Sequence, residues 1–132
     1  MGVELPKHIL IIDDSPSVIA AMREVLEGHG HRVSTASSLR EVEVQTHRSG
    51  DTFDLLLVDV QMPELDGDEI VLMLQTMHKF EAPIYLLSGL NSDELSRRAK
   101  AVEAAGYISK SAGLEEMVRQ AEEALRSGGQ GM

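Results

Sequence analysis

Short apolar runs separated by longer amphipathic stretches are the most regular feature of this chain. The run Leu55–Val58 is continuously apolar, ends in Asp59 and is followed by the turn-forming segment Met62–Gly67. A run without polar alternation, too short for a convincing helix, is typical of a strand buried on both faces of a parallel sheet. Runs of this kind at residues 8–12, 55–58 and 83–87, with a weaker one at 32–36 and a short one at 106–109, predict five strands.

The stretches between these runs carry helix signals. Ser15 and Pro16 suit the N-cap and the first position of a helix, and Ser38 and Glu41 have the spacing of a capping box. The predicted helices begin near residues 15, 38, 66, 91 and 113 and extend to about 28, 47, 77, 104 and 126. Residues 127–132 are expected to form a flexible tail or a cut linker.

Five strand–helix repeats joined by short loops predict an α/β fold. The expected architecture is a doubly wound (βα)5 sandwich, flavodoxin-like, with a five-stranded parallel sheet. A length of 132 residues fits one domain over residues 1–126, followed by the tail.

Composition narrows the class of protein. Hydrophobic residues make up 42% and charged residues 26%, as in soluble globular domains. The absence of cysteine excludes disulfides, zinc–thiolate sites and thiol nucleophiles. No apolar run approaches the length of a membrane span and the N-terminus lacks a signal-peptide pattern, so a cytoplasmic location and no membrane partner are expected.

The net charge of −10 argues against direct binding of nucleic acid. Twenty-two acidic residues face twelve basic ones, and the field of such a chain repels polyanions. The aromatic residues are too few for a platform on which bases could stack; they are Phe53, Phe80, Tyr85 and Tyr107.

The residues that end the predicted strands carry the chemistry. The first strand ends in Asp13 and Asp14, the third in Asp59, the fourth in Ser88 and the fifth in Lys110. Strands of a parallel sheet end at one edge, where ligands bind, so these side chains should converge. Two carboxylates about 4 Å apart repel by roughly 1 kcal/mol in water and about 4 kcal/mol at an effective dielectric near 20. Lys110 and a Mg²⁺ ion would supply the counter-charge.

This set of groups indicates phosphoryl transfer. A carboxylate can act as a nucleophile and form an aspartyl phosphate, while a metal, an ammonium and a hydroxyl stabilise the phosphoryl oxygens. Each residue alone also has an ordinary explanation: a helix start for Asp13 and Asp14, a cap for Ser88 and a solvated surface charge for Lys110. Their joint occurrence at four strand ends favours the phosphoryl-transfer reading.

The chain resembles the receiver domain of bacterial two-component response regulators. The resemblance runs from about Lys7 to Arg126 and is carried by four segments, Ile11–Ser15, Val58–Gly67, Leu87–Gly89 and Gly106–Lys110.

It implies that Asp59 accepts a phosphoryl group from a phosphohistidine and that Ser88 and Lys110 hold the phosphoryl oxygens. It also implies Mg²⁺ ligation by Asp14 directly, by Asp13 through a water, by Asp59 and by the backbone carbonyl of Gln61. Tyr107 matches the aromatic residue that turns inward when Ser88 is drawn to the phosphate.

The resemblance also implies partners. These are a sensor histidine kinase or phosphotransfer protein as donor, and a downstream protein on the face of the fourth helix, fifth strand and fifth helix. Such a domain catalyses its own phosphorylation and slow dephosphorylation but signals by changing shape. The chain is either a single-domain regulator or a receiver cut from a longer chain.

One position departs from the family pattern. The family usually has a proline in a cis peptide bond after the lysine, and here Ser111 follows Lys110. A cis bond without proline costs roughly 2.5–4 kcal/mol, so a trans Lys110–Ser111 bond is predicted. Ser111 is then free to serve as the N-cap of the last helix.

Two alternative functions, and two alternative roles for histidines, are less well supported by the sequence. A magnesium-dependent phosphohydrolase would need a second Asp two residues after the nucleophile, where Gln61 stands. A pseudo-receiver that is never phosphorylated is supported only by Ser111. His29 and His31 could bind a metal, but they fall in a glycine-bracketed turn without an evident third ligand, so a surface loop is the preferred interpretation. His78 lacks the dimeric helical bundle that a phosphodonor histidine would need.

Overall fold

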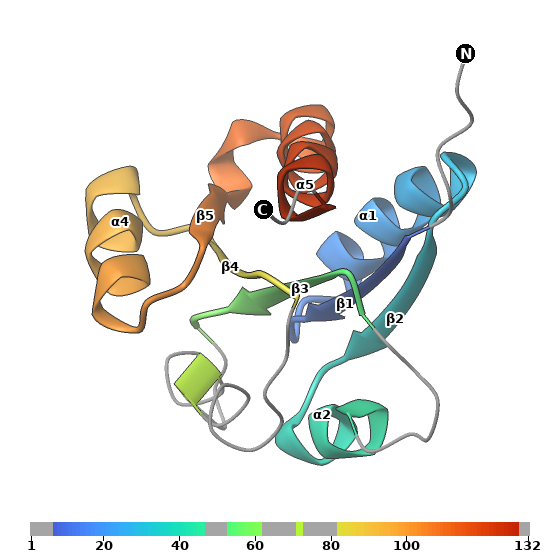
Figure 1. Ribbon diagram of the computed structural model, residues 1–132, viewed down its shortest axis with the longest axis horizontal. Helices are drawn as coiled ribbons and strands as arrows, with labels where there is room; N and C mark the ends of the chain where they lie inside the picture. Colours follow the sequence, from blue (N-terminus) through green and yellow to red (C-terminus); the bar gives the residue numbers. More distant parts are fainter. Residues whose placement is uncertain (1–6, 47–52, 62–70, 73–81, 130–132) are drawn as a thin grey trace.

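The computed structural model describes residues 7–46, 53–61, 71–72 and 82–129 (Figure 1). The predicted turn Met62–Gly67 lies outside these ranges. Of the helix predicted from Asp66, only residues 71–72 are described, and they are helical. No helix within the described ranges is long and apolar enough to cross a membrane.

A five-stranded parallel sheet forms the middle layer. Its order is β2-β1-β3-β4-β5, so β3 is central, as a doubly wound fold requires. The strands agree with the predicted runs to within one residue; they are β1 (His8–Ile12), β2 (Arg32–Ala36), β3 (Leu55–Asp59), β4 (Ile84–Ser88) and β5 (Gly106–Ser109).

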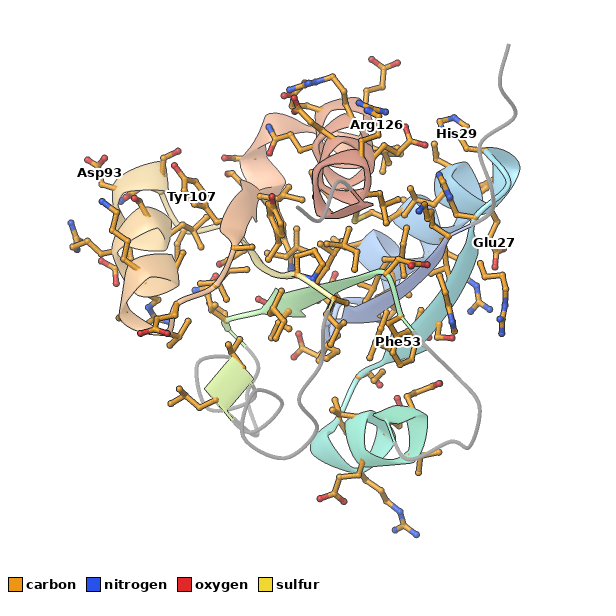
Figure 2. All side chains as sticks on the ribbon, in the orientation of Figure 1. Glu27, His29, Phe53, Asp93, Tyr107 and Arg126 are labelled. Carbon is orange, nitrogen blue, oxygen red and sulfur yellow. The ribbon has the colours of Figure 1, made fainter. Side chains whose placement is uncertain are left out.

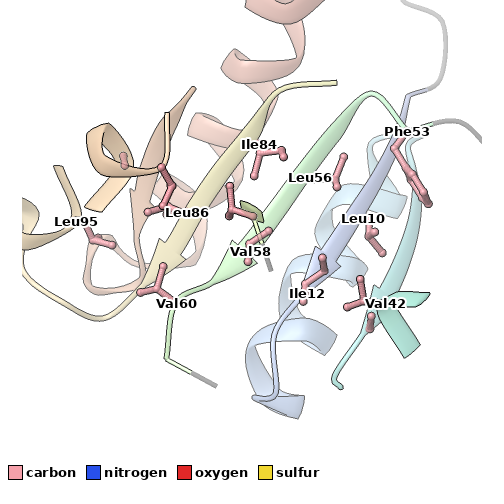
Figure 3. Packing of buried hydrophobic residues seen from close by; sticks show 14 residues of the cluster. Leu10, Ile12, Val42, Phe53, Leu56, Val58, Val60, Ile84, Leu86 and Leu95 are labelled. Carbon is pink, nitrogen blue, oxygen red and sulfur yellow. The ribbon is translucent and has the colours of Figure 1, made fainter. Parts of the chain in front are cut away.

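Both faces of the sheet are buried, which explains why β1 and β3 lack polar alternation. Every residue of these two strands is buried, and successive side chains enter opposite clusters. Leu10 and Leu56 belong to the cluster that includes Val42 of α2 and Leu95 of α4 (Figure 3). The cluster on the other face is closed by α1 and α5; its helical members are Met22, Leu26, Met117, Val118, Ala121, Ala124 and Leu125.

Helix α1 (Pro16–Gly28) starts where the sequence predicts, with proline in its first turn. Ser15 has the extended backbone of an N-cap, but its side chain makes no capping hydrogen bond. Helix α2 spans Leu39–Thr46. Here the Ser38 hydroxyl accepts from the Glu41 N–H at 3.2 Å, as the capping-box spacing predicts, while the Glu41 carboxylate reaches Ser37 N at 2.7 Å.

Helix α4 (Ser92–Ala101) ends three residues before its predicted end. Asn91 caps it, with its side-chain oxygen accepting from Glu94 N at 2.9 Å. At the other end Glu103 adopts φ +59°, and its N–H bonds to Lys100 O while Ala104 N–H bonds to Ala99 O. These two bonds form a Schellman motif, which closes the helix without the glycine that usually marks this position.

Helix α5 (Leu114–Gly129) extends three residues beyond its predicted end, so Ser127–Gly129 belong to the helix and not to a tail. Lys110–Ala112 form the short 3-10 turn η1 between β5 and α5. The described ranges contain no cis peptide bond, so the Lys110–Ser111 bond is trans, as predicted. The predicted role of Ser111 as the N-cap of α5 is wrong, because Ser111 lies within η1, where its N–H bonds to Ser109 Oγ at 3.2 Å.

Candidate functional site

Three carboxylates meet at the carboxyl edge of the sheet, where the sequence predicts them. Strands β1 and β3 are neighbours with Ile12 opposite Val58, and the next residue of each strand therefore brings Asp13 beside Asp59. Asp13, Asp14 and Asp59 each offer an oxygen within 4.8 Å of the others. Asp13 and Asp59 are buried, with 0% and 2% of their surface exposed, and Asp14 is half-buried.

Backbone hydrogen bonds fix two of these carboxylates. Asp13 Oδ1 accepts from Ser15 N at 2.8 Å, and Asp59 Oδ1 accepts from Gln61 N at 2.9 Å. Both bonds join a carboxylate to the N–H two residues later, the local pattern that aspartate favours in turns. Each aspartate therefore keeps its second oxygen, Oδ2, for other partners.

Lys110 supplies the positive charge at this edge. Its Nζ lies 2.9 Å from Asp13 Oδ2 and 3.5 Å from Asp59 Oδ2. Asp13 Oδ2 is buried and has no hydrogen bond of good geometry to any described residue, so its contact with Lys110 acts mainly as an ion pair. The lysine thus joins the end of β5 to β1 and β3, across the intervening strand β4.

Burial raises the pKa of the Asp59 carboxyl above its ordinary value, and the neighbouring Asp13 charge acts in the same direction. The Gln61 N–H and the Lys110 ammonium lower this pKa but do not cancel the rise. Three carboxylates face one ammonium, so the ionised cluster carries excess negative charge. An all-oxygen donor set with such an excess is chemically suited to a hard divalent cation such as Mg²⁺.

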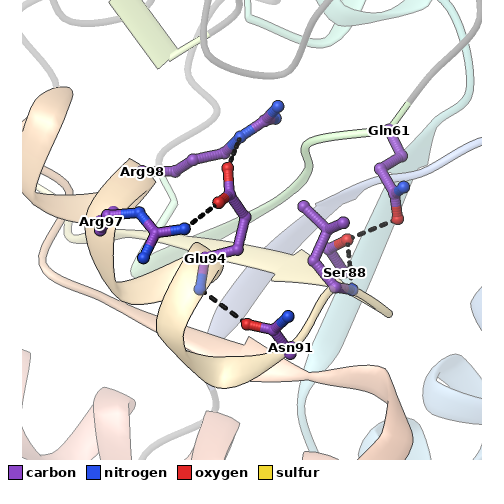
Figure 4. A network of polar contacts seen from close by, with 7 residues as sticks. Gln61, Ser88, Asn91, Glu94, Arg97 and Arg98 are labelled. Atoms are coloured by element: carbon purple, nitrogen blue, oxygen red, sulfur yellow. Dashed lines mark hydrogen bonds and ion pairs between the residues drawn. The ribbon is translucent and has the colours of Figure 1, made fainter.

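Ser88 lies at the end of β4, beside the strand that carries Asp59, and is fully buried. Its hydroxyl donates to Gln61 Oε1 at 2.7 Å and accepts from Leu90 N at 3.1 Å (Figure 4). The sequence predicts a role for the backbone of Gln61 but not for its side chain. Neither propensity nor periodicity reports this contact, because it depends on how β3 and β4 are placed side by side.

Tyr107 of β5 lies opposite Leu86 in the sheet. Its half-buried side chain packs against the hydrophobic cluster that includes Leu95 of α4 (Figure 2). Ser88 and Tyr107 therefore lie on neighbouring strands, and both lie close to α4.

The histidines of the α1–β2 turn are not isolated. His29 Nδ1 lies 2.7 Å and His31 Nε2 3.2 Å from Glu122 Oε2 of α5. The expectation that no third ligand-type residue lies near this turn is therefore wrong. Glu122 is 91 residues from His31, and the packing of α1 against α5 brings them together.

Comparisons with known proteins agree on one family for this chain. A family model described as the response regulator receiver domain matches residues 9–122. The chain is 36% identical, over 78% of its length, to the gliding motility regulatory protein of Myxococcus xanthus, of which it covers 13%. It is 31% identical, over 92% of its length, to Response regulator MprA of Mycolicibacterium vanbaalenii, of which it covers 52%. The chain thus spans about half the length, or less, of these curated relatives.

Solved structures share the fold. Chemotaxis response regulator CheY4 of Vibrio cholerae aligns with a TM-score of 0.78 at 29% identity, covering 91% of this chain and 99% of that one. A CheY-like receiver domain protein from Methanospirillum hungatei JF-1 aligns with a TM-score of 0.82 at 23% identity, over 97% and 100% of the two chains. The second likeness shows the fold alone.

Proposed function

This chain belongs to the response regulator receiver domain family, and we propose that it is a phosphorylation-dependent switch with Asp59 as its phosphoryl acceptor. The observation that carries the proposal is the place of Asp59 at the end of the central strand. Its carboxylate lies beside Asp13 and within 3.5 Å of the Lys110 ammonium. The proposed nucleophile, its acidic neighbours and the cation proposed to bind the transferred group all lie at one edge of the sheet.

In the proposed reaction a carboxylate oxygen of Asp59 attacks the phosphorus of a phosphohistidine. An oxygen–phosphorus bond forms, the phosphorus–nitrogen bond breaks, and the imidazole leaves with the electron pair. The Gln61 N–H holds Asp59 Oδ1, so the carboxylate is oriented before the donor arrives. Lys110 Nζ, on the Oδ2 side, is placed to stabilise negative charge on the phosphoryl oxygens.

Asp13, Asp14, Asp59 and the backbone carbonyl of Gln61 are the groups proposed to hold Mg²⁺. When bound, the ion offsets the negative charge that three carboxylates and a phosphoryl group bring together. Lys110 and Asp13 form an ion pair at 2.9 Å, so one of the three carboxylates already has a positively charged partner at this edge.

Ser88 is proposed to couple phosphorylation to a change of shape. Its hydroxyl hydrogen is donated to Gln61 Oε1, so it must leave Gln61 to donate to a phosphoryl oxygen on Asp59. The same hydroxyl accepts from Leu90 N, one residue before the cap of α4, and a displacement of Ser88 therefore acts on the start of that helix. Tyr107, packed near α4, is the proposed second switch residue.

The proposed donor is a sensor histidine kinase or a phosphotransfer protein, and the proposed cellular location is the cytoplasm. The proposed output surface is the face of α4, β5 and α5. Support for this surface is its position: α4 packs on β5, and η1, which carries Lys110, connects β5 to α5. A displacement of Lys110 would therefore move the connection between β5 and α5, and a displacement of Ser88 would move the start of α4. No direct contact with nucleic acid is proposed.

The test is phosphorylation by a small donor. Acetyl phosphate and Mg²⁺ should add one phosphoryl mass to the wild-type protein, as measured by intact-protein mass spectrometry. Asp59→Asn should add none, whereas the matched control Asp93→Asn, which changes an exposed aspartate on α4, should behave like the wild type. A wild-type protein that gains no mass, although folded and supplied with Mg²⁺, would support the pseudo-receiver alternative.

A further inference from the structure

A cluster of two histidines and one glutamate lies away from the aspartate site. His29 Nδ1 and His31 Nε2 both contact Glu122 Oε2, at 2.7 Å and 3.2 Å. His31 directly precedes β2, so the cluster lies at the amino edge of the sheet, whereas Asp13 and Asp59 lie at the carboxyl edge. Figure 2 labels His29 at the end of α1. We call His29, His31 and Glu122 the amino-edge cluster.

The backbone of the α1–β2 turn holds the two histidines in place. Gly30 N–H bonds to Glu27 O at 3.0 Å and His31 N–H bonds to Leu26 O at 3.1 Å. With Gly30 at φ +95°, these bonds form a Schellman motif at the end of α1. A motif of this kind has a defined geometry, so it fixes the backbone of His29 and His31, whose side chains contact Glu122 of α5.

The third member comes from a well-anchored helix. Glu122 follows Ala121 and precedes Ala124 and Leu125, which are all buried against the sheet. Burial raises the pKa of the Glu122 carboxyl, but the hydrogen bonds from His29 and His31 outweigh it and leave this pKa below its ordinary value. Its Oε2 atom faces both imidazoles, which makes Glu122 the third ligand of the proposed site.

We propose that the amino-edge cluster is a second metal site, which binds a late divalent transition metal such as Zn²⁺. Two imidazole nitrogens and one carboxylate oxygen form a donor set that zinc uses with a fourth, open position. Imidazole favours zinc, copper and nickel, whereas Mg²⁺ favours the all-oxygen set of the aspartates. The two sites should therefore select different ions.

Metal binding requires a rearrangement of the amino-edge cluster, because within the described residues only the aspartates already place three ligand atoms within 4.8 Å of one another. In the present arrangement the two nitrogens face one shared oxygen, as N–H donors. To bind a metal, each imidazole must present its lone pair, so its proton moves to the other ring nitrogen and no net proton is lost from a neutral ring. For His31 that nitrogen is Nδ1, which is buried and has no hydrogen-bond partner among the described residues, so His31 must also shift to give this N–H a partner. His29 has 47% of its side chain exposed and Glu122 23%, whereas His31 has 10%, so most of the rotation falls to His29 and Glu122, and a water can take the fourth position on their exposed side.

The consequence is a metal cross-link between α5 and the turn after α1. Its ligands come from segments more than ninety residues apart, and an ion that binds the folded state alone stabilises it by mass action. The proposed site does not depend on the phosphorylation of Asp59, and Asp59→Asn should bind zinc as the wild type does.

The test is zinc titration by calorimetry, with millimolar Mg²⁺ present to occupy the aspartates. One zinc ion per chain is expected, and Glu122→Gln, His29→Asn and His31→Asn should each weaken binding at least about tenfold, since even loss of a group that only orients a ligand costs 10–100-fold. The matched control Glu123→Gln, which alters an exposed neighbour on the same helix, should keep wild-type affinity.

Cobalt(II) gives a second readout. It should produce a visible absorption band that Glu122→Gln removes and Glu123→Gln retains. Glu122→Gln and His29→Asn alter partly exposed side chains, so circular dichroism should show both variants folded. No zinc binding by the wild-type protein, or equal binding by the wild type and all three ligand variants, would overturn the site and leave the cluster as a hydrogen-bonded clasp only.

Discussion

At the scale of the residue, Asp59 combines properties that oppose each other. It must be ionised to attack phosphorus, yet burial and the adjacent Asp13 raise the pKa of its carboxyl. The Gln61 N–H and Lys110 lower this pKa and so offset part of the rise. The folded state of the metal-free protein therefore binds a proton at Asp59 more tightly than the unfolded state does, and ionisation of Asp59 reduces the free energy of unfolding.

Because ionisation of Asp59 lowers the free energy of unfolding, replacing Asp59 with asparagine should stabilise the metal-free protein. As pH rises from below the ordinary aspartate pKa, about 4, through the raised value, the wild type loses stability at this site and the amide does not. In chelator at neutral pH the variant should melt a few degrees above the wild type, and the gap should close at low pH. Thermal melts at several pH values measure both. A variant that melts at or below the wild type at neutral pH would show that Lys110 fully compensates the buried charge.

Gln61 is the second residue whose side chain bears on the switch. Replacement by leucine removes the acceptor for the Ser88 hydroxyl but keeps the backbone N–H that holds Asp59. A net hydrogen bond is worth about 0.5–1.5 kcal/mol, so Gln61→Leu should tighten binding of the phosphoryl mimic beryllofluoride, with Mg²⁺, by about two- to tenfold. Calorimetry measures the change.

The control for Gln61→Leu is the same substitution in a Ser88→Ala background. There the hydroxyl is gone, so the leucine should have no effect on beryllofluoride affinity. An equal gain in both backgrounds would mean that Gln61 acts by another route than its bond to Ser88.

At the scale of the element, sequence patterns predict the strands better than the helix ends. Buried strands in a doubly wound sheet need continuous apolar runs, and these are visible without any knowledge of packing. The end of α4 is not visible, because Glu103 takes a positive φ that a non-glycine residue rarely adopts. The end of α5 is missed for the opposite reason, since Gly128 and Gly129 look like breakers but lie within the helix.

Glu103 gives a prediction at this scale. It is exposed and has φ +59°, so replacement by glycine removes the steric cost of the left-handed conformation. Glu103→Gly should raise the free energy of unfolding by about 1 kcal/mol, as measured by urea denaturation. Glu103→Ala, which keeps a Cβ, should not; a gain of equal size with alanine would assign the effect to the lost charge.

At the scale of the whole molecule, topology accounts for most of the candidate site. Parallel strands bring Asp13, Asp59 and Ser88 to one edge, and the sequence places these residues at strand ends without reference to structure. The amino-edge cluster could not be predicted in the same way. Its members lie on a turn and on a helix that meet only because α1 and α5 pack on the same face, and no local pattern reports that contact.

Magnesium dependence of folding is a prediction at this scale. An ion that binds only the folded protein raises the free energy of unfolding by about 1.4 kcal/mol at ten times its dissociation constant. The melting temperature of the wild type should therefore rise with millimolar Mg²⁺, and Asp14→Ala should flatten the response while Asp93→Asn leaves it intact. A wild-type curve that does not move with Mg²⁺ would count against metal binding by the aspartates.

The central claim is that Asp59 itself carries the phosphoryl group. Borohydride reduces an aspartyl phosphate to homoserine, which marks the acceptor in the covalent chain. After phosphorylation with acetyl phosphate and Mg²⁺, reduction and peptide mass mapping should find homoserine at position 59 and aspartate at positions 13 and 14. Homoserine at either of those positions, or a phosphorylated protein without homoserine at position 59, would contradict the assignment.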